Sequence, residues 1–369
     1  MTDMRAGMGT EVRRVYLHVG TPKSGTTHLQ RRLRRNAETL RAHGVGIPRN
    51  PRRARGIDAS FRAALDLTGQ DFGGPPGHAR GAWARAVRQS RRQRVTVISH
   101  ELLATADADV IRRARADLAD AELHVVVTAR DPARALPAAW QESVKQGRRL
   151  TYRQFLDRAR EGEVWLARAM DVDAVLESWG ADLPADRLHL VTLPRPGADR
   201  DLLWQRFCDA LGIDPDSGPL PADRSNESLG IAETQLLRRV NRRHGRRNPE
   251  AHRLLKYVVA EGALSLRDSM PILLPPEDHA WVAELAERWI GWVRERGVPV
   301  SGDLDDLRPR PTQGEWRDPD EPVPAEVAGA AVDALAATIA EVSRPPVPDR
   351  PMVRLRAGVH ARWRSLRRR

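Results

Sequence analysis

Cysteine, lysine and long apolar runs are all scarce in this chain of 369 residues. Its one cysteine, Cys208, excludes an intramolecular disulfide, as is typical of proteins in a reducing compartment. No stretch of about 18 apolar residues occurs, so the sequence predicts no membrane-spanning helix. Residues 1–14 lack the apolar segment of a secretory signal. These absences together predict a cytoplasmic protein.

Lysine occurs only as Lys23, Lys145 and Lys256, although Lys and Arg together number 61. The formal net charge is +12, which by itself would favour a nucleic-acid partner. We interpret the excess of positive charge as arginine spread over a solvated surface. No series of aromatic residues that could stack on single-stranded nucleic acid accompanies it. The sequence therefore predicts no nucleic-acid partner, while a positive field would help to collect an anionic cofactor.

Strand and helix patterns alternate over the first part of the chain. The runs typical of strands are residues 15–19, 45–48, 94–99, 122–129 and 188–193. The helical patterns between them are residues 26–43, 82–93, 107–118 and a helix that begins at Pro132 behind the cap Asp131. Residues 49–78 are rich in Arg, Gly and Pro and predict a long irregular excursion. This alternation predicts an α/β, P-loop-type three-layer fold with a central, mostly parallel sheet.

From about residue 201 onward the pattern predicts helices alone. They are expected at residues 201–211, 231–244, 249–264, 277–296 and 324–342. The segments of the chain are then a flexible N-terminus at 1–13, an α/β core at 14–212, a helical extension of the same domain at 213–301, a linker and helix at 302–343, and a Pro-rich linker with a basic amphipathic tail at 344–369. The helical C-terminal portion is expected to form part of a substrate pocket.

The sequence GTPKSGTT, residues 20–27, lies between the first strand and the following helix. Backbone N–H groups and the positive end of a helix can hold an anion at such a place. The loop resembles a Walker A loop but departs from it, because GxxxxGK[ST] requires lysine where this chain has Thr26. The lysine, Lys23, lies three residues earlier. This shift suits a shorter phosphate group, bound without a metal ion.

The segment TPKSGTT after the first strand is similar to the donor loop of the sulfotransferase family. The likeness extends to HLQRRLRRN in the following helix and to RDP at residues 130–132, and it covers roughly residues 14–212. The resemblance implies 3′-phosphoadenosine 5′-phosphosulfate (PAPS) as the sulfuryl donor. The donor-binding residues that it implies are Thr21, Lys23, Ser24, Gly25, Thr26, Thr27 and Arg130. It also implies that Lys23 stabilises the charge that develops on the bridging oxygen as the sulfuryl group leaves.

Arg130 follows a predicted central strand, at the sheet edge where ligands bind in open parallel sheets. A guanidinium there suits a phosphate, through paired hydrogen bonds. The resemblance implies that Arg130 contacts the 3′-phosphate of the donor, together with a serine eight residues later. This chain has Ala138 at that position, so Arg134 or a more distant basic residue would have to compensate. Alternatively, Arg130 pairs with a nearby carboxylate and only stabilises the start of the helix.

His100 and Glu101 follow the strand at residues 94–99, again at the carboxyl edge. Sulfuryl transfer needs a base that removes the proton of the acceptor, and a histidine or a carboxylate serves this purpose. Cytosolic members of the family have a catalytic histidine after the corresponding strand, and carbohydrate-modifying members have a glutamate. Both alternatives stay open here. His18, on the first strand, is interpreted as a core histidine.

The function that follows is a sulfotransferase acting on a hydroxyl or amine of a small-molecule, lipid or carbohydrate acceptor. Two alternatives remain, a P-loop nucleotide kinase or NTPase and a catalytically inactive family member that binds PAPS. In the tail, seven arginines accompany a stripe of apolar residues at helical spacing: Leu355, Val359, Trp363 and Leu366. Such a tail is suited to peripheral contact with an anionic membrane. Nothing in the sequence predicts an oligomeric state.

Overall fold

One parallel sheet organises the computed structural model, which describes residues 12–51, 58–72, 74–222, 228–244, 249–311 and 314–343. The strands are β1 (Arg14–His18), β2 (Val45–Gly46), β3 (Val95–Ser99), β4 (Glu122–Ala129), β5 (Leu188–Thr192) and β6 (Val300–Ser301). Their order in the sheet is β2-β3-β1-β4-β5-β6, and every neighbouring pair is parallel. The predicted α/β fold is therefore confirmed. After β1 the chain forms β2 and β3 on one side of it and then crosses to β4 on the other side. Ligands bind at such a reversal of strand order, so they are expected beyond the carboxyl ends of β1, β3 and β4.

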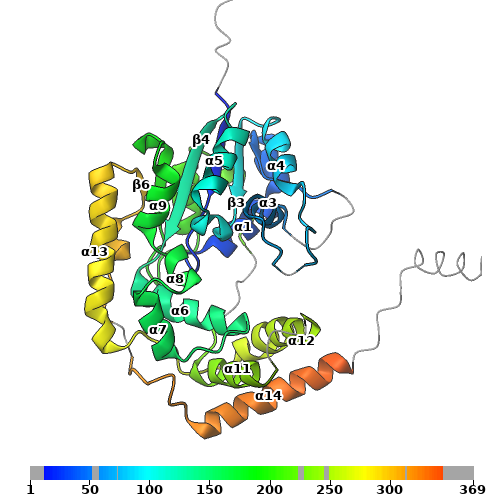
Figure 1. Ribbon diagram of the computed structural model, residues 1–369, viewed down its shortest axis with the longest axis vertical. Coiled ribbons are helices and arrows are strands. Elements are labelled where there is room, and N and C mark those ends of the chain that lie inside the picture. Colours follow the sequence, from blue (N-terminus) through cyan, green and yellow to red (C-terminus); the bar gives the residue numbers. More distant parts are fainter. Residues whose placement is uncertain are drawn as a thin grey trace, which may run out of the picture.

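Helices cover both faces of this sheet (Figure 1). One face packs on α3 (Ala59–Thr68), α4 (Ala82–Ser90), α5 (Ala108–Asp117), α9 (Val172–Gly180) and α13 (His279–Arg296). The other face packs on α1 (Thr26–Arg35), α2 (Ala37–Ala42) and α10 (Leu202–Leu211). Successive strand residues point to opposite faces, so Val15 and Leu17 enter the first core and Tyr16 enters the second.

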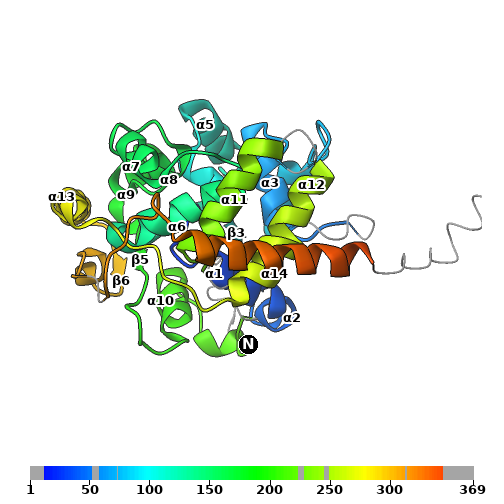
Figure 2. The same cartoon turned by 90° about the horizontal axis from the view of Figure 1, so that it is seen from below.

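A helical lobe with its own core adjoins the sheet (Figures 1 and 2). Its helices are α6 (Pro132–Lys145), α7 (Tyr152–Arg160), α8 (Trp165–Ala169), α11 (Ile231–His244), α12 (Pro249–Arg253), a π-helix (Leu254–Ala263) and α14 (Pro324–Val342). Short 3₁₀ helices span Glu101–Thr105, Ala185–Arg187, Pro215–Ser217, Leu264–Leu266, Pro276–Asp278 and Leu304–Leu307. Because α6 starts directly after β4, the lobe lies at the carboxyl edge of the sheet.

Two expectations for the N-terminal half were wrong in detail. The predicted helix at 26–43 is two helices, because the side-chain amide of Asn36 donates to the carbonyl oxygens of Arg32 and Leu220 and interrupts the helix. The excursion at 49–78 contains α3, which the sequence analysis missed. The Asp58 carboxylate accepts from the Phe61 amide and caps this helix, whose small apolar side chains are buried on the sheet.

The expectation of helices alone after residue 201 was also wrong, because β6 completes the sheet. Its two residues pair with β5, with Val300 opposite Leu190. Two residues are too few to show an alternating pattern in a sequence.

The remaining expectations concern membranes and the tail. No helix in the described part of the chain is both long and apolar enough to cross a membrane. The basic tail after residue 343, residues 1–11 and part of the 49–78 excursion lie outside the described residues.

Candidate functional site

The loop at residues 20–25 crosses the carboxyl end of β1 and is tied to β4. The amide and the hydroxyl of Thr21 both donate to the Thr128 carbonyl oxygen, at 3.0 and 2.9 Å. Gly20, Lys23 and Gly25 have positive φ angles of 48°, 67° and 88°, and Lys23 is the one non-glycine residue in the described part of the chain with this conformation. A lysine held in a left-handed conformation is strained, which is common at functional sites.

Helix α1 begins at this loop without a side-chain cap. Gly25 is its N-cap, and no acidic residue lies in its first turn. The amides of the first turn, including those of Thr26 and Thr27, have no partner within the helix. A side chain caps α3, α5, α6 and α7, whereas α4, α9, α10 and α13 lack one as α1 does; among these, α1 is the one that follows the loop at the carboxyl end of β1. The start of α1 thus presents open N–H groups and the positive end of the helix dipole, which suits an anion.

A buried hydrogen-bond network supports the loop from below. The Ser24 hydroxyl lies 2.6 Å from both the Thr21 carbonyl oxygen and Thr128 Oγ1. His18 joins Thr128 Oγ1 through Nε2 (3.1 Å) and Ser99 Oγ through Nδ1 (2.8 Å). Burial, with His100 nearby, lowers the pKa of His18 to about 3, so the ring is neutral at pH 7. His18 is the expected core histidine. Within the loop, the hydroxyl of Ser24 is engaged by Thr21 and Thr128, and its amide donates to the Thr21 carbonyl oxygen at 3.4 Å.

Lys23 forms an ion pair that the sequence analysis missed. Its Nζ lies 2.7 Å from Oε2 of Glu142, which projects from α6. Burial alone would raise the pKa of Glu142, but the Lys23 ammonium beside it, with further help from Lys256 and Lys145, holds that pKa at about 2. Glu142 is therefore ionised throughout the physiological range.

All three lysines of the chain act on this one carboxylate. Lys145 lies in the last turn of α6 and Lys256 on the π-helix, a form that is frequent at functional sites. Lys145 as a residue is 9% exposed, and its ammonium makes no hydrogen bond or ion pair with the described residues. Burial and then the charge of Lys23 lower its pKa. The one signal for this cluster in the sequence was the rarity of lysine itself.

Arg130 lies beside the loop at the end of β4. Its Nη1 donates to the Lys23 carbonyl oxygen at 3.4 Å, whereas its Nε is buried and has no hydrogen-bond partner within the described residues. Burial, and then the charge of Arg134, lower the pKa of Arg130 to about 10. Arg134 is bonded to Asp131 through Nε, but its Nη2 is likewise buried without a partner. Two guanidiniums therefore offer buried donors at the same sheet edge.

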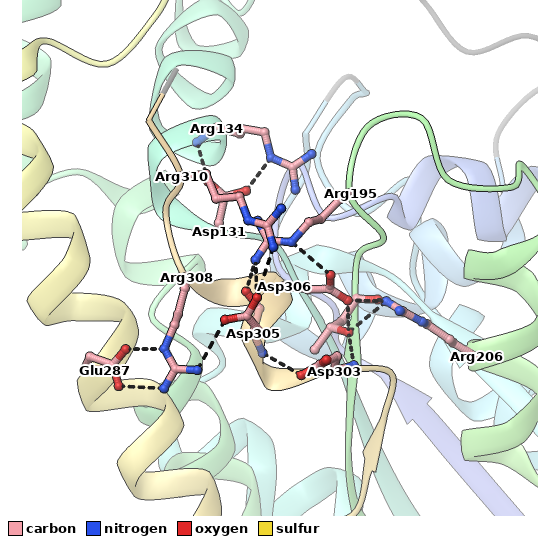
Figure 3. Close-up of polar contacts among 11 residues, drawn as sticks. Asp131, Arg134, Arg195, Arg206, Glu287, Asp303, Asp305, Asp306, Arg308 and Arg310 are labelled. Carbon is pink, nitrogen blue, oxygen red and sulfur yellow. Dashed lines mark hydrogen bonds and ion pairs between the residues drawn. The ribbon is translucent and has the colours of Figure 1, made fainter. Parts of the chain in front are cut away.

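The neighbouring arginines are matched by carboxylates, as Figure 3 shows. Arg195 pairs with Asp305 and Asp306, and Arg206 Nη1 lies 2.6 Å from Asp306 Oδ2. Arg130 forms no ion pair with any described residue, so the alternative of a structural pair with a carboxylate has no support in the geometry.

His100 and Glu101 follow β3 on the other side of the loop. The His100 amide donates to the His18 carbonyl oxygen at 3.1 Å, and its Nδ1 accepts from the Leu102 amide at 3.1 Å. A neutral ring that accepts at Nδ1 carries its proton on Nε2. The Glu101 carboxylate accepts from Gln30 Nε2 of α1 at 3.2 Å. The ends of β1, β3 and β4 thus bring the loop, the His100–Glu101 pair and Arg130 together.

Comparisons with known proteins add one distant likeness. The chain is similar to the crystal structure of a sulfotransferase from Alicyclobacillus acidocaldarius, at 16% sequence identity and a TM-score of 0.40, over 61% of this chain and 90% of that one. No family model matches the chain, and no curated protein matches it. The chemistry of the site therefore has to follow from its own residues.

Proposed function

We propose that the protein is a sulfotransferase that uses PAPS as its donor. The observation that carries the proposal is the placement of two cationic groups at the ends of adjacent strands. Lys23 lies in the loop at the uncapped start of α1, and Arg130, with a buried Nε that lacks a partner, lies at the end of β4. A 3′-phosphorylated nucleotide sulfate carries its negative charge at two separate ends, and these groups match them.

The residues present fit such a donor. The amides of Gly25, Thr26 and Thr27 and the Lys23 ammonium would hold its 5′-phosphosulfate, with Thr21 shaping the loop. Arg130 and the buried, unpartnered Nη2 of Arg134 would hold its 3′-phosphate, and Arg134 would take the place of the serine that is absent at Ala138. When bound, the donor supplies the sulfuryl group for in-line displacement. Lys23 would neutralise charge on the oxygen that the sulfuryl group leaves.

We assign the role of base to Glu101 rather than to His100. The Nδ1 atom of His100 accepts from the Leu102 amide, so in the neutral ring the proton lies on Nε2. The Glu101 carboxylate accepts a hydrogen bond from Gln30 and is partly exposed at the carboxyl edge. It can therefore receive the proton of an acceptor hydroxyl. The acceptor is a small molecule, lipid or carbohydrate.

A nucleotide kinase is less compatible with these contacts. Such an enzyme needs a carboxylate near the loop for Mg²⁺. At the end of β4 the candidate is Asp131, but both of its oxygens serve Arg134, through the helix cap and through the ion pair. The other carboxylate that reaches the loop, Glu142, is paired with Lys23. Lysine is also absent at position 26.

Titration calorimetry with 3′-phosphoadenosine 5′-phosphate (PAP) tests the proposed donor. We expect micromolar binding at one site, unchanged by removal of Mg²⁺, because the site holds its anion with Lys23, amides and guanidiniums. ATP serves as the control ligand. Absence of PAP binding together with Mg²⁺-dependent ATP binding would establish the kinase instead. PAP binding without any turnover of PAPS, across a screen of acceptors, would identify an inactive binding protein.

Replacing Arg130 with alanine tests the 3′-phosphate assignment. We expect the R130A variant to bind PAP about 30-fold more weakly, or about 2 kcal/mol, the usual loss for a hydrogen bond to a charged group. AMP, which has no 3′-phosphate, is the matched ligand and should lose less than about threefold. Equal losses for the two nucleotides would mean that Arg130 acts only by supporting the loop through its bond to the Lys23 carbonyl oxygen.

A further inference from the structure

Glu142 competes with the proposed donor for Lys23, because one ammonium cannot pair fully with the carboxylate and with the donor anion at once. In the structure, the Lys23–Glu142 pair is direct, at 2.7 Å, and Gln146 Nε2 donates to the other Glu142 oxygen at 3.2 Å. A donor anion in the loop would draw Lys23 away. The carboxylate, whose burial alone would raise its pKa, would then lose its strongest stabilising charge.

The same helix carries a cation with no partner of its own. Lys145 lies three residues after Glu142 on α6, and side chains at this spacing are neighbours on a helix surface. Lys145 as a residue is 9% exposed, and its ammonium makes no hydrogen bond or ion pair with the described residues. Its Nζ is not among the fully buried polar atoms without a partner, so it reaches solvent and can receive a carboxylate without giving up another contact.

A cluster of five charged residues contains Lys23, Glu142, Lys145, Lys256 and Glu261. The charges of Lys23, Lys145 and Lys256 all act on Glu142, and Glu261 acts on Lys145 as a second carboxylate. The cluster therefore contains three cations and two anions. With an anion on Lys23, the other two lysines and the two glutamates are equal in number.

We propose that Glu142 is a positioning residue that changes its ion-pair partner from Lys23 to Lys145 when the donor occupies the loop. We call this exchange of partners the handover. Before the donor binds, it holds the Lys23 ammonium at the start of α1 and prevents it from pairing with other carboxylates. In the loaded protein it pairs with Lys145, so that Lys23 is released without leaving a buried carboxylate unpaired. This inference rests on the proposed function, since it assumes that Lys23 binds the donor.

A double-mutant cycle on PAP binding tests the handover. Calorimetry at fixed ionic strength would compare the intact protein, Lys145→Met, Glu142→Gln and the double variant. We expect Lys145→Met to weaken PAP binding about tenfold although Lys145 does not touch the nucleotide, because Glu142 then has no second partner. In the Glu142→Gln background the same change should alter affinity less than about twofold. Glu142→Gln alone should bind PAP at least as tightly as the intact protein.

Controls separate this inference from simpler effects. Lys145→Arg should restore most of the affinity, and Lys256→Met, which removes the same charge close to Glu142, should change it less than about threefold. Equal losses for Lys145→Met in both backgrounds would place Lys145 directly on the nucleotide and overturn the handover. No loss in either background would overturn it too. Failure of the intact protein to bind PAP would overturn the proposed function, and the handover with it.

A second measurement needs no variant. Reductive ¹³C-methylation labels the three lysines and the N-terminal amine, few enough for each NMR signal to be resolved. Addition of PAP should move the Lys23 and Lys145 signals together, with Lys256 changing less. Movement of the Lys23 signal alone would contradict the handover while supporting the donor site.

Discussion

Lys23→Ala is expected to lower the affinity for PAP at least about tenfold, or about 1.4 kcal/mol, and the rate of sulfuryl transfer about a thousandfold. The loss in binding follows from removal of the one side-chain cation inside the loop at the start of α1. The larger loss in rate follows because charge on the leaving oxygen is greatest in the transition state, where Lys23 would neutralise it. Calorimetry with PAP and release of radiolabelled sulfate from PAPS measure the two effects.

The choice of controls depends on Glu142. Lys23→Ala removes the direct partner of this carboxylate, whose side chain is 21% exposed and keeps its hydrogen bond from Gln146, so some loss of folding stability is expected. The Lys23→Ala/Glu142→Gln double variant removes both charges and separates folding from function, with thermal unfolding as the check. Arg34→Ala removes an equal charge from the exposed face of α1 and should leave PAP binding unchanged. Unaltered PAP affinity in both Lys23 variants would contradict the assigned site.

Glu101→Gln is expected to lower the rate of transfer about a hundredfold while PAP affinity stays within about twofold. The substitution keeps the size of the side chain and an oxygen that can accept from Gln30, but it removes the basic carboxylate. The loss should be confined to the transfer step, because the carboxylate would face the acceptor rather than the nucleotide. Single-turnover transfer from radiolabelled PAPS, to water or to acceptors found in a screen, measures it.

His100→Asn is the matched variant. An asparagine oxygen can still accept from the Leu102 amide and cap the 3₁₀ helix, so the local backbone is preserved while the outer ring nitrogen is removed. We expect a loss of less than about tenfold, since the outer nitrogen carries a proton and cannot act as a base. A large loss in His100→Asn together with normal transfer by Glu101→Gln would reverse the assignment and make His100 the base.

The strands of the sheet show how much of the fold local sequence patterns could predict. Strands β1, β3, β4 and β5 were predicted within about one residue of their ends, since each is a short run rich in apolar and β-branched residues. Because the carboxyl ends of parallel strands share one edge, those predictions also placed Lys23, His100 and Arg130 near one another. Strand β6, which has two residues, and the alanine-rich α3 were missed. Helices α7, α8 and α9, within residues 152–180, were not predicted either, although Thr151 and Gln154 form a capping box at the start of α7.

Residues adjacent in the chain specify the loop at 20–25 and its setting, because a strand, a glycine-containing turn and a helix start are local features. What Lys23 contacts depends instead on tertiary packing. Glu142 is 119 residues away along the chain, and it reaches the loop because α6 runs from the end of β4, beside β1. Lys145 was likewise indistinguishable from a solvated lysine until the packing of the helical lobe buried it. Pairing and burial depend on distances through space, which spacing along a chain does not encode.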